Sequence, residues 1–178
     1  MAKYQQQDRG AGNDYDRYLK GMDASMRQKV ALTAAHLLCE GQIADMGMGS
    51  GTGSQALAAL YPSLEVIGVD INQEMVDRAA DRYKLSNLRF QQGDIAERCF
   101  SDQYLEAILN SSVLHHVTSF NGYDHSAAER ALHNQTKQLS YDGILITSQL
   151  RSTLRFFHDK IIWFHTDLYF DRSGLVMS

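Results

Sequence analysis

The chain has 178 residues, of which 44% are hydrophobic and 21% are charged, and this fits a single globular domain with one core. The formal net charge of −4 argues against a broad nucleic-acid-binding surface, and the polar N-terminus has no apolar stretch typical of a signal peptide or membrane span. We therefore expect a cytoplasmic protein with no membrane partner, in which Cys39 and Cys99 are buried free thiols rather than parts of a disulfide framework or metal site.

The first part of the chain divides into an arm and a helix. Residues 1–14 are polar, contain glycine and lack periodicity, so we expect a flexible arm. From Tyr15 to Leu38, apolar residues recur at helical spacing and predict a helical layer. We expect Gly41 to end this helix as a C-cap glycine and a first strand to begin at about Gln42.

A glycine-rich loop follows the first strand. From Asp45 to Gly51 the sequence alternates as acidic-x-Gly-x-Gly-x-Gly, and helical spacing returns from Ser54 onwards. Glycines permit positive φ and let the backbone approach a ligand, while the following helix presents free N–H groups. The third glycine of a dinucleotide fingerprint and the lysine of a P-loop are both missing. The acid stands at the strand end, where a ligand's cationic amino group could be met.

The second predicted strand, residues 64–70, also ends in an acid. Asp70 lies about 25 residues after Asp45, at a strand end where a carboxylate can accept hydrogen bonds from a ribose diol. The alternative is that Asp70 merely caps the helix predicted from Asn72 to about Lys84. We favour the ribose role, because nucleoside binding requires a strand-end acid after a glycine-rich loop.

A third acid follows the third predicted strand, residues 88–92. The Asp94 carboxylate could accept a hydrogen bond from the exocyclic amine of an adenine, with Ile95 packing on the ring. A carboxylate that caps the following turn explains the same sequence equally well, so both interpretations stay open.

The fourth predicted strand, residues 104–110, ends in polar residues, as strands do where open parallel sheets bind ligands. His115 and His116 follow it. Adjacent residues on a helix point about 100° apart, so this pair could not chelate one metal ion, and we reject a metal site. His115, His116 or Tyr15 could act as a base, with His115 the catalytic candidate, although a structural histidine is the commoner case.

The remaining elements complete an alternating pattern. Residues 119–126 predict a loop that could form part of an acceptor pocket, residues 127–139 a helix, Asp142-Gly143 a turn and residues 144–148 a fifth strand. Strands that alternate with helices predict an α/β fold, a Rossmann-like doubly wound and mostly parallel sheet with helices on both faces. We expect a single domain over residues 15–178, with its cofactor-binding core at about 41–150.

The C-terminal segment, residues 151–178, is densely aromatic. A helix through Phe157, Ile161, Phe164 and Leu168 would carry an apolar stripe. We favour core packing for this stripe, and the alternatives are an acceptor pocket or a contact between subunits of a homo-oligomer.

Several ordered motifs together resemble the class I S-adenosylmethionine-dependent methyltransferases, over residues from about 15 to 150. They are the loop from Asp45 to Gly51, the strand ends around Asp70 and Asp94, residues 108–117, and the turn at residues 142–145. The resemblance implies S-adenosylmethionine as the cofactor. The positions that it assigns to cofactor binding are Tyr18, Asp45, Gly47, Met48, Gly49, Gly51, Asp70, Ile71, Met75, Asp94, Ile95, Asn110 and Ser111.

Departures from the family narrow the acceptor. Family members that methylate amino groups of bases or glutamine carry Asn/Asp-Pro-Pro-aromatic after the fourth strand, where this chain has Asn-Ser-Ser-Val at residues 110–113. Neither cysteine sits where cytosine C5 enzymes place their nucleophile. The resemblance therefore implies a small-molecule or lipid-like acceptor methylated on O, N or C. The family usually adds a C-terminal strand hairpin, and the short segment after residue 150 suggests a shortened chain or one completed by a partner.

Two other functions stay open at this point. One is a non-catalytic S-adenosylmethionine-binding or regulatory module, which the short C-terminal segment would favour. The other is an NAD(P)-dependent oxidoreductase. This chain has the strand-end acid of that class but lacks the third glycine of its dinucleotide fingerprint.

Overall fold

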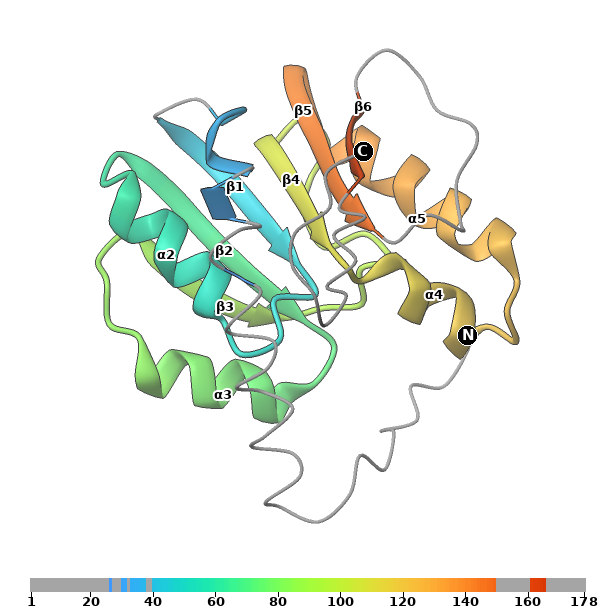
Figure 1. Ribbon diagram of the computed structural model, residues 1–178, viewed down its shortest axis with the longest axis horizontal. Helices are drawn as coiled ribbons and strands as arrows, with labels where there is room; N and C mark the ends of the chain where they lie inside the picture. The colour runs from blue at the N-terminus through green and yellow to red at the C-terminus, as the bar shows by residue number, and fades with distance from the viewer. Residues whose placement is uncertain (1–25, 27–29, 32, 38–39, 150–160, 166–178) are drawn as a thin grey trace, which may run out of the picture.

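The computed structural model describes residues 26, 30–31, 33–37, 40–149 and 161–165, with side chains up to residue 148. The strands in these ranges form one six-stranded sheet in the order β3-β2-β1-β4-β5-β6, and every neighbouring pair is parallel (Figure 1). The strands are β1 (Gly41–Met46), β2 (Leu64–Asp70), β3 (Leu88–Gln92), β4 (Leu105–Ser111), β5 (Leu139–Gln149) and β6 (Ile161–His165). The predicted doubly wound α/β fold is confirmed.

Helices cover both faces of this sheet, with α2 and α3 on one side and α4 and α5 on the other (Figure 1). Their bounds are α2 (Thr52–Leu60), α3 (Gln73–Arg82), α4 (Leu114–Phe120) and α5 (His125–Gln138). Apolar strand residues alternate between the two faces, because successive side chains of a strand point in opposite directions. In β1, for example, Ile43 packs in the cluster with Leu57 of α2, whereas Ala44 packs in the cluster with Leu132 of α5.

Residues before β1 add to the layer that contains α2. Met26, Val30, Ala31, Thr33 and Ala34 are helical, as predicted. The Tyr61 hydroxyl donates to the carbonyl of Ala34 at 2.9 Å, which joins this helical segment to the end of α2. Among the described residues, no helix is both long and apolar enough to cross a lipid bilayer.

The predicted helix stop at Gly41 is wrong. The helical residues end at Ala34, and Gly41 instead opens β1 with a φ of 105°. Glycine is needed there because a Cβ would lie 2.9 Å from side-chain atoms of Glu106, whose carboxylate accepts a hydrogen bond from the backbone of Gln42.

The predicted turn at Asp142-Gly143 lies inside β5. Leu105 of β4 pairs with Leu139, and Ala107 pairs with Ile144, so the extra residues of β5 form an irregularity in the strand. The loop predicted over residues 119–126 is also shorter, since α4 continues to Phe120 and α5 begins at His125. Turn-forming residues therefore marked a bulge in one case and helix ends in the other.

The helix predicted through Ile161 and Phe164 is wrong, because residues 161–165 form the strand β6. These residues are β-branched and aromatic, which suits a strand, and they pair parallel to β5 from Leu145 to Gln149. Phe157 and Leu168, the other members of the predicted stripe, lie outside the described residues.

Candidate functional site

The glycine loop at the end of β1 has the backbone geometry that the sequence predicts. Gly47, Gly49 and Gly51 have φ values of 72°, 58° and 75°, in the left-handed region that favours glycine. The N–H groups of Gly47 and Met48 both donate to the carbonyl of Val69, at 2.8 and 3.0 Å. The loop is thereby held against the end of β2, and no side chain caps α2 at Gly51. In the first turn of α2, the N–H of Thr52 donates to the Ser50 hydroxyl at 3.4 Å.

Asp70 joins the end of β2 to this loop. One carboxylate oxygen accepts a hydrogen bond from the backbone N–H of Gly49 at 3.0 Å, and the other accepts from Asn72 at 2.9 Å. Burial raises the pKa of Asp70, and the backbone N–H groups of Asn72, Gly49 and Ile71 oppose that rise. The N-cap of α3 is Asn72, whose side chain accepts from Glu74, so Asp70 is not the residue that caps this helix.

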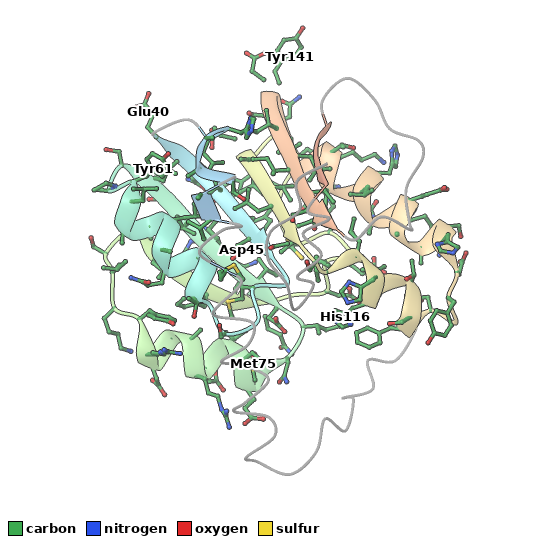
Figure 2. The ribbon with its side chains drawn as sticks, viewed as in Figure 1. Glu40, Asp45, Tyr61, Met75, His116 and Tyr141 are labelled. Carbon is green, nitrogen blue, oxygen red and sulfur yellow. The ribbon has the colours of Figure 1, made fainter. Side chains whose placement is uncertain are left out.

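Asp45 lies beneath the loop and is 5% exposed. Its carboxylate accepts a hydrogen bond from the Ser54 hydroxyl of α2 at 2.7 Å, and Figure 2 shows it near the middle of the sheet. A Cβ on Gly53 would lie 3.5 Å from the same carboxylate and 2.8 Å from the sulfur of Met26. The Asp45 carboxylate thus joins the first turn of α2 to the end of β1.

Asp94 follows β3 and caps the next turn, since its carboxylate accepts a hydrogen bond from the backbone of Ala96 at 2.9 Å. Ile95 is 6% exposed and packs in the core cluster on the side of α4 and α5. The capping interpretation of Asp94 is therefore realised in the structure, and Ile95 contributes to the core.

Asn110 ends β4 in a buried amide pair with Gln135 of α5. The Asn110 amide donates to Gln135 at 2.6 Å, and the Gln135 amide lies 3.3 Å from both Asn110 Oδ1 and the carbonyl of Ile95. Gln135 was not among the residues predicted from the sequence to form the site. The available signal was its helical spacing from Ala128, Ala131 and Leu132, which places a polar residue on the buried face of α5.

These ends of β1, β2, β3 and β4 lie at one edge of the sheet, because parallel strands share their carboxyl end. The sheet order reverses direction between β1 and β4, the place where open α/β sheets bind their ligands. Residues 43–143, more than half of the chain, match the family model for a methyltransferase domain.

The chain belongs to the methyltransferase domain family. It is 27% identical to malonyl-[acyl-carrier protein] O-methyltransferase of Bacillus cereus over 146 residues, which cover 78% of this chain and 49% of that protein. It is 41% identical to trans-aconitate 2-methyltransferase of Deinococcus radiodurans over 56 residues, which cover 32% of this chain and 21% of that protein. The chain thus spans half or less of the length of these relatives.

Solved structures share the fold. A candidate S-adenosylmethionine-dependent methyltransferase of Methanococcus maripaludis superposes with a TM-score of 0.62 and 20% identity, over 84% of this chain and 67% of that one. S-adenosylmethionine is the cofactor that family membership assigns to the methyltransferase domain. The residues present suit it, because the glycine loop directly follows β1 and the Asp70 carboxylate accepts the N–H of Gly49 beside it.

Several residues that were predicted to bind the cofactor have buried side chains. Met48 packs with Val76 and Ala79 of α3, and Met75 is 6% exposed at the start of that helix. The backbone of Met48 is hydrogen-bonded within the protein, since its N–H donates to Val69 and its carbonyl accepts from Gly51. Ile71 is half-buried directly after Asp70. Tyr18, Tyr15 and Cys39 lie outside the described residues.

The adjacent histidines His115 and His116 lie in α4. Their ring centroids are only 4.0 Å apart, so the expectation that they point well away from each other is wrong. The difference arises because side-chain torsions, and not only the helical turn, direct a ring. His115 is exposed, and His116 stacks on Phe120 with ring centroids 5.7 Å apart (Figure 2). Within the described ranges, no group of three or more His, Cys, Asp or Glu residues is arranged to hold a metal ion.

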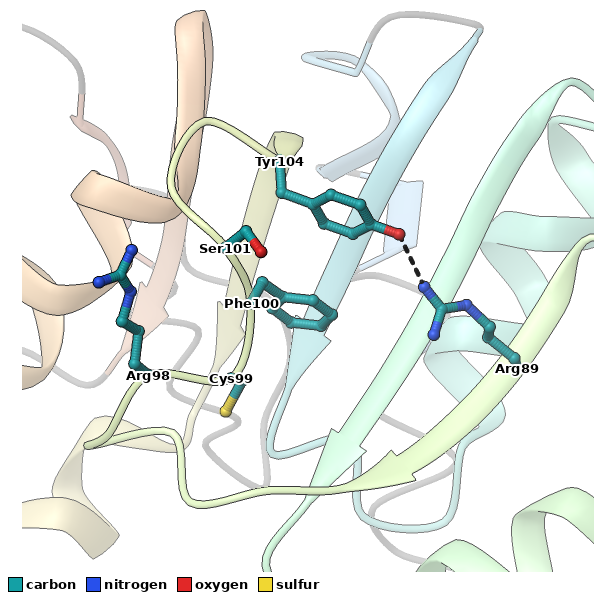
Figure 3. Close-up of a pocket in the computed structure, with 6 residues that line it drawn as sticks. All are labelled: Arg89, Arg98, Cys99, Phe100, Ser101 and Tyr104. Atoms are coloured by element: carbon teal, nitrogen blue, oxygen red, sulfur yellow. Dashed lines mark hydrogen bonds between the residues drawn. The ribbon is translucent and has the colours of Figure 1, made fainter.

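A cavity of about 550 Å³ lies over the segment between β3 and β4 (Figure 3). The Arg89 guanidinium at its rim donates to the Tyr104 hydroxyl at 3.2 Å, and Tyr104 stacks on Phe100. Cys99 also lines the cavity, and burial together with the charges of Asp94 and Glu97 raises its pKa to about 11. Cys99 is a half-buried free thiol whose sulfur donates to the carbonyl of Asp94 at 3.3 Å.

Proposed function

We propose that this chain transfers a methyl group from S-adenosylmethionine to a carboxylate oxygen of a small molecule. The observation that carries the proposal is the junction of the glycine loop with Asp70 at the carboxyl edge of the sheet. When bound, the cofactor supplies a methyl group on a sulfonium centre. The names of two relatives, an O-methyltransferase of a malonyl group and a methyltransferase of trans-aconitate, support an acidic acceptor.

In this proposal, residues of the chain bind the cofactor and hold the end of β4 in position. The Gly47–Gly51 loop and the first turn of α2 hold the amino-acid part of the cofactor, and Asp70 accepts hydrogen bonds from its ribose. Asn110 is fixed by Gln135, so the end of β4 keeps its position beside the loop. Rigid placement of both reactants is the main source of rate in such a displacement.

A carboxylate acceptor also explains why little acid–base chemistry is needed. Carboxyl groups have pKa values of about 4 and are already ionised at neutral pH, so no base has to remove a proton before transfer. We therefore assign His115, which is exposed on α4, no necessary role in the reaction.

The test combines binding with turnover. The purified chain is titrated with S-adenosylhomocysteine, with NAD as the control, and is then incubated with S-adenosylmethionine and either malonate or trans-aconitate while methyl esters are measured by mass spectrometry. We expect micromolar binding of S-adenosylhomocysteine, which corresponds to about −8 kcal/mol, no binding of NAD, and ester formation. Binding without any ester would favour the regulatory module, and binding of NAD would favour the oxidoreductase.

The proposal also includes the binding partners of the chain and its location in the cell. We propose a small-molecule acceptor rather than a nucleic acid, a cytoplasmic location, and self-association through the aromatic C-terminal segment. Size-exclusion chromatography with light scattering, compared between this chain and one that ends at residue 150, tests the last point. An unchanged molecular state would remove the C-terminal segment as the contact.

A further inference from the structure

Two buried hydroxyl groups stand side by side at the carboxyl ends of β4 and β5. Ser111 and Ser148 are register partners in the sheet. Their Oγ atoms are both inaccessible to solvent, and neither has a hydrogen-bond partner in the structure as far as it is described. Buried hydroxyl groups are seldom left without a partner, so this pair needs an explanation.

The pair lies on the same face of the sheet as Asp45. Leu109 and Ile146 pack in the cluster with Ile43 on the side of α2, and alternation along each strand places Ser111 and Ser148 on that side too. Leu109 is the register partner of Asp45. Ser111 is two residues further along β4, so the hydroxyl pair lies beyond Asp45 in the direction of the carboxyl edge.

The backbone holds the two serines in place. The N–H of Ser112 donates to the carbonyl of Ser148 at 2.7 Å, which ties the end of β4 to the end of β5. Ser112 has a φ of 54°, a left-handed conformation that a residue with a side chain adopts at a cost. Such backbone strain tends to occur where a ligand is bound. The pair is therefore pre-positioned.

We propose that Ser111 and Ser148 together bind a carboxylate group of a ligand in this site. Each hydroxyl offers one O–H donor, and neighbouring strands lie about 4.8 Å apart, so the two donors can reach the two oxygens of one carboxylate. Asp45, whose register partner Leu109 lies two residues before Ser111, already accepts a hydrogen bond from the Ser54 hydroxyl at 2.7 Å.

Two molecules could supply this carboxylate. One is the acceptor, and this source rests on the proposed function. The other is the amino-acid part of the cofactor. The experiment separates them by titrating wild type, Ser111→Ala and Ser148→Ala with four probes: malonate, trans-aconitate, S-adenosylhomocysteine, and 5′-methylthioadenosine, which lacks the amino-acid part.

If the acceptor is the source, Ser148→Ala raises the Kd for malonate or trans-aconitate by about tenfold, as loss of one hydrogen bond to a charged group predicts, and leaves both adenosine probes unchanged. If the cofactor is the source, the Kd for S-adenosylhomocysteine rises by a similar factor while that for 5′-methylthioadenosine is unchanged. Ser148→Thr keeps a hydroxyl group and is expected to retain most of the affinity in either case.

Thr147→Val is the matched control, because the Thr147 hydroxyl is also buried without a described partner but lies one residue away on the opposite face of β5. Its affinities should equal those of wild type. The proposal is overturned if all four probes bind the serine variants as they bind wild type, if no carboxylate probe binds, or if Thr147→Val has the same effect. If the wild-type chain binds malonate or trans-aconitate but not S-adenosylhomocysteine, the proposed carboxylate site at Ser111 and Ser148 stands and the proposed methyl transfer is wrong.

Discussion

The carboxylate of Asp70 accepts a hydrogen bond from the backbone N–H of Gly49 at 3.0 Å, so the acid that ends β2 contacts the loop that ends β1 directly. We expect Asp70→Ala to weaken S-adenosylhomocysteine binding by about a hundredfold or more, since two hydrogen bonds to a charged group would be lost. Calorimetric titration measures this. Glu65→Gln, an exposed acid on the same strand, is the control and should bind as wild type. Unchanged affinity in Asp70→Ala would remove the ribose assignment.

The raised pKa of Asp70 predicts a dependence of cofactor binding on pH. Only the ionised carboxylate is a full acceptor, so S-adenosylhomocysteine affinity should fall as the pH is lowered through the raised pKa, which lies above the ordinary value of 3.8. The affinity of Asp70→Asn should lack this fall. Titrations at a series of pH values from 8 downwards compare the two.

The Asp70 carboxyl group should affect stability and cofactor binding in opposite directions: lowering the pH weakens binding but increases its contribution to the free energy of unfolding. Because folding raises the pKa of Asp70, its contribution to the free energy of unfolding is fully present below 3.8 and is lost as the pH rises through the folded-state pKa. Urea unfolding measures the free energy of unfolding of wild type and of Asp70→Asn between pH 3.8 and the raised folded-state pKa. The difference between the two values should become smaller as the pH is lowered.

Gly47→Ala should be much more disruptive than Gly122→Ala, although both glycines have a positive φ, of 72° and 66°. A Cβ on Gly47 would lie 2.2 Å from a methyl group of Val113, whereas nothing lies within 4 Å of one on Gly122. Left-handed strain alone costs about 1–2 kcal/mol, and overpacking adds about 1–3 kcal/mol at Gly47. Urea unfolding of both variants tests this. Adding Val113→Ala to Gly47→Ala should recover part of the loss, and equal effects of the two single variants would contradict the prediction.

The buried amide pair between Asn110 and Gln135 should couple these residues energetically. Gln135→Leu leaves the Asn110 amide without its partner, at a cost of about 1–3 kcal/mol in the free energy of unfolding. The double variant with Asn110→Ala should cost less than the sum of the two single variants, with a coupling of about 0.5 kcal/mol or more. Strict additivity in this double-mutant cycle would show that the pair contributes no joint stability.

Cys99 should react slowly with iodoacetamide at neutral pH, because its pKa of about 11 leaves little thiolate. The rate should rise steeply as the pH approaches that value, and Cys39→Ala isolates the reaction of Cys99. Mass spectrometry follows the modification. Fast alkylation of the folded chain at pH 7.5 would show that the thiol is not held in a buried environment.

Much of the strand and loop pattern could be predicted from local sequence. The bounds predicted for residues 64–70 and 88–92 agree with β2 and β3, and the glycine loop stands directly after β1. These features depend on residue type over short windows: β-branched runs favour strands, and consecutive left-handed turns need glycine. The carboxyl-edge location of the loop and Asp70 followed from the parallel order of the strands.

The sequence by itself thus determined the class of fold, the glycine loop and the acids that follow the strands. The tertiary structure alone decided that Asn110 pairs with Gln135, that Ser111 stands beside Ser148, and that residues 161–165 form a strand rather than a helix. The reason is that a side chain's partner depends on how distant elements pack. A short window of sequence encodes the periodicity of an element but not the neighbour that it will meet.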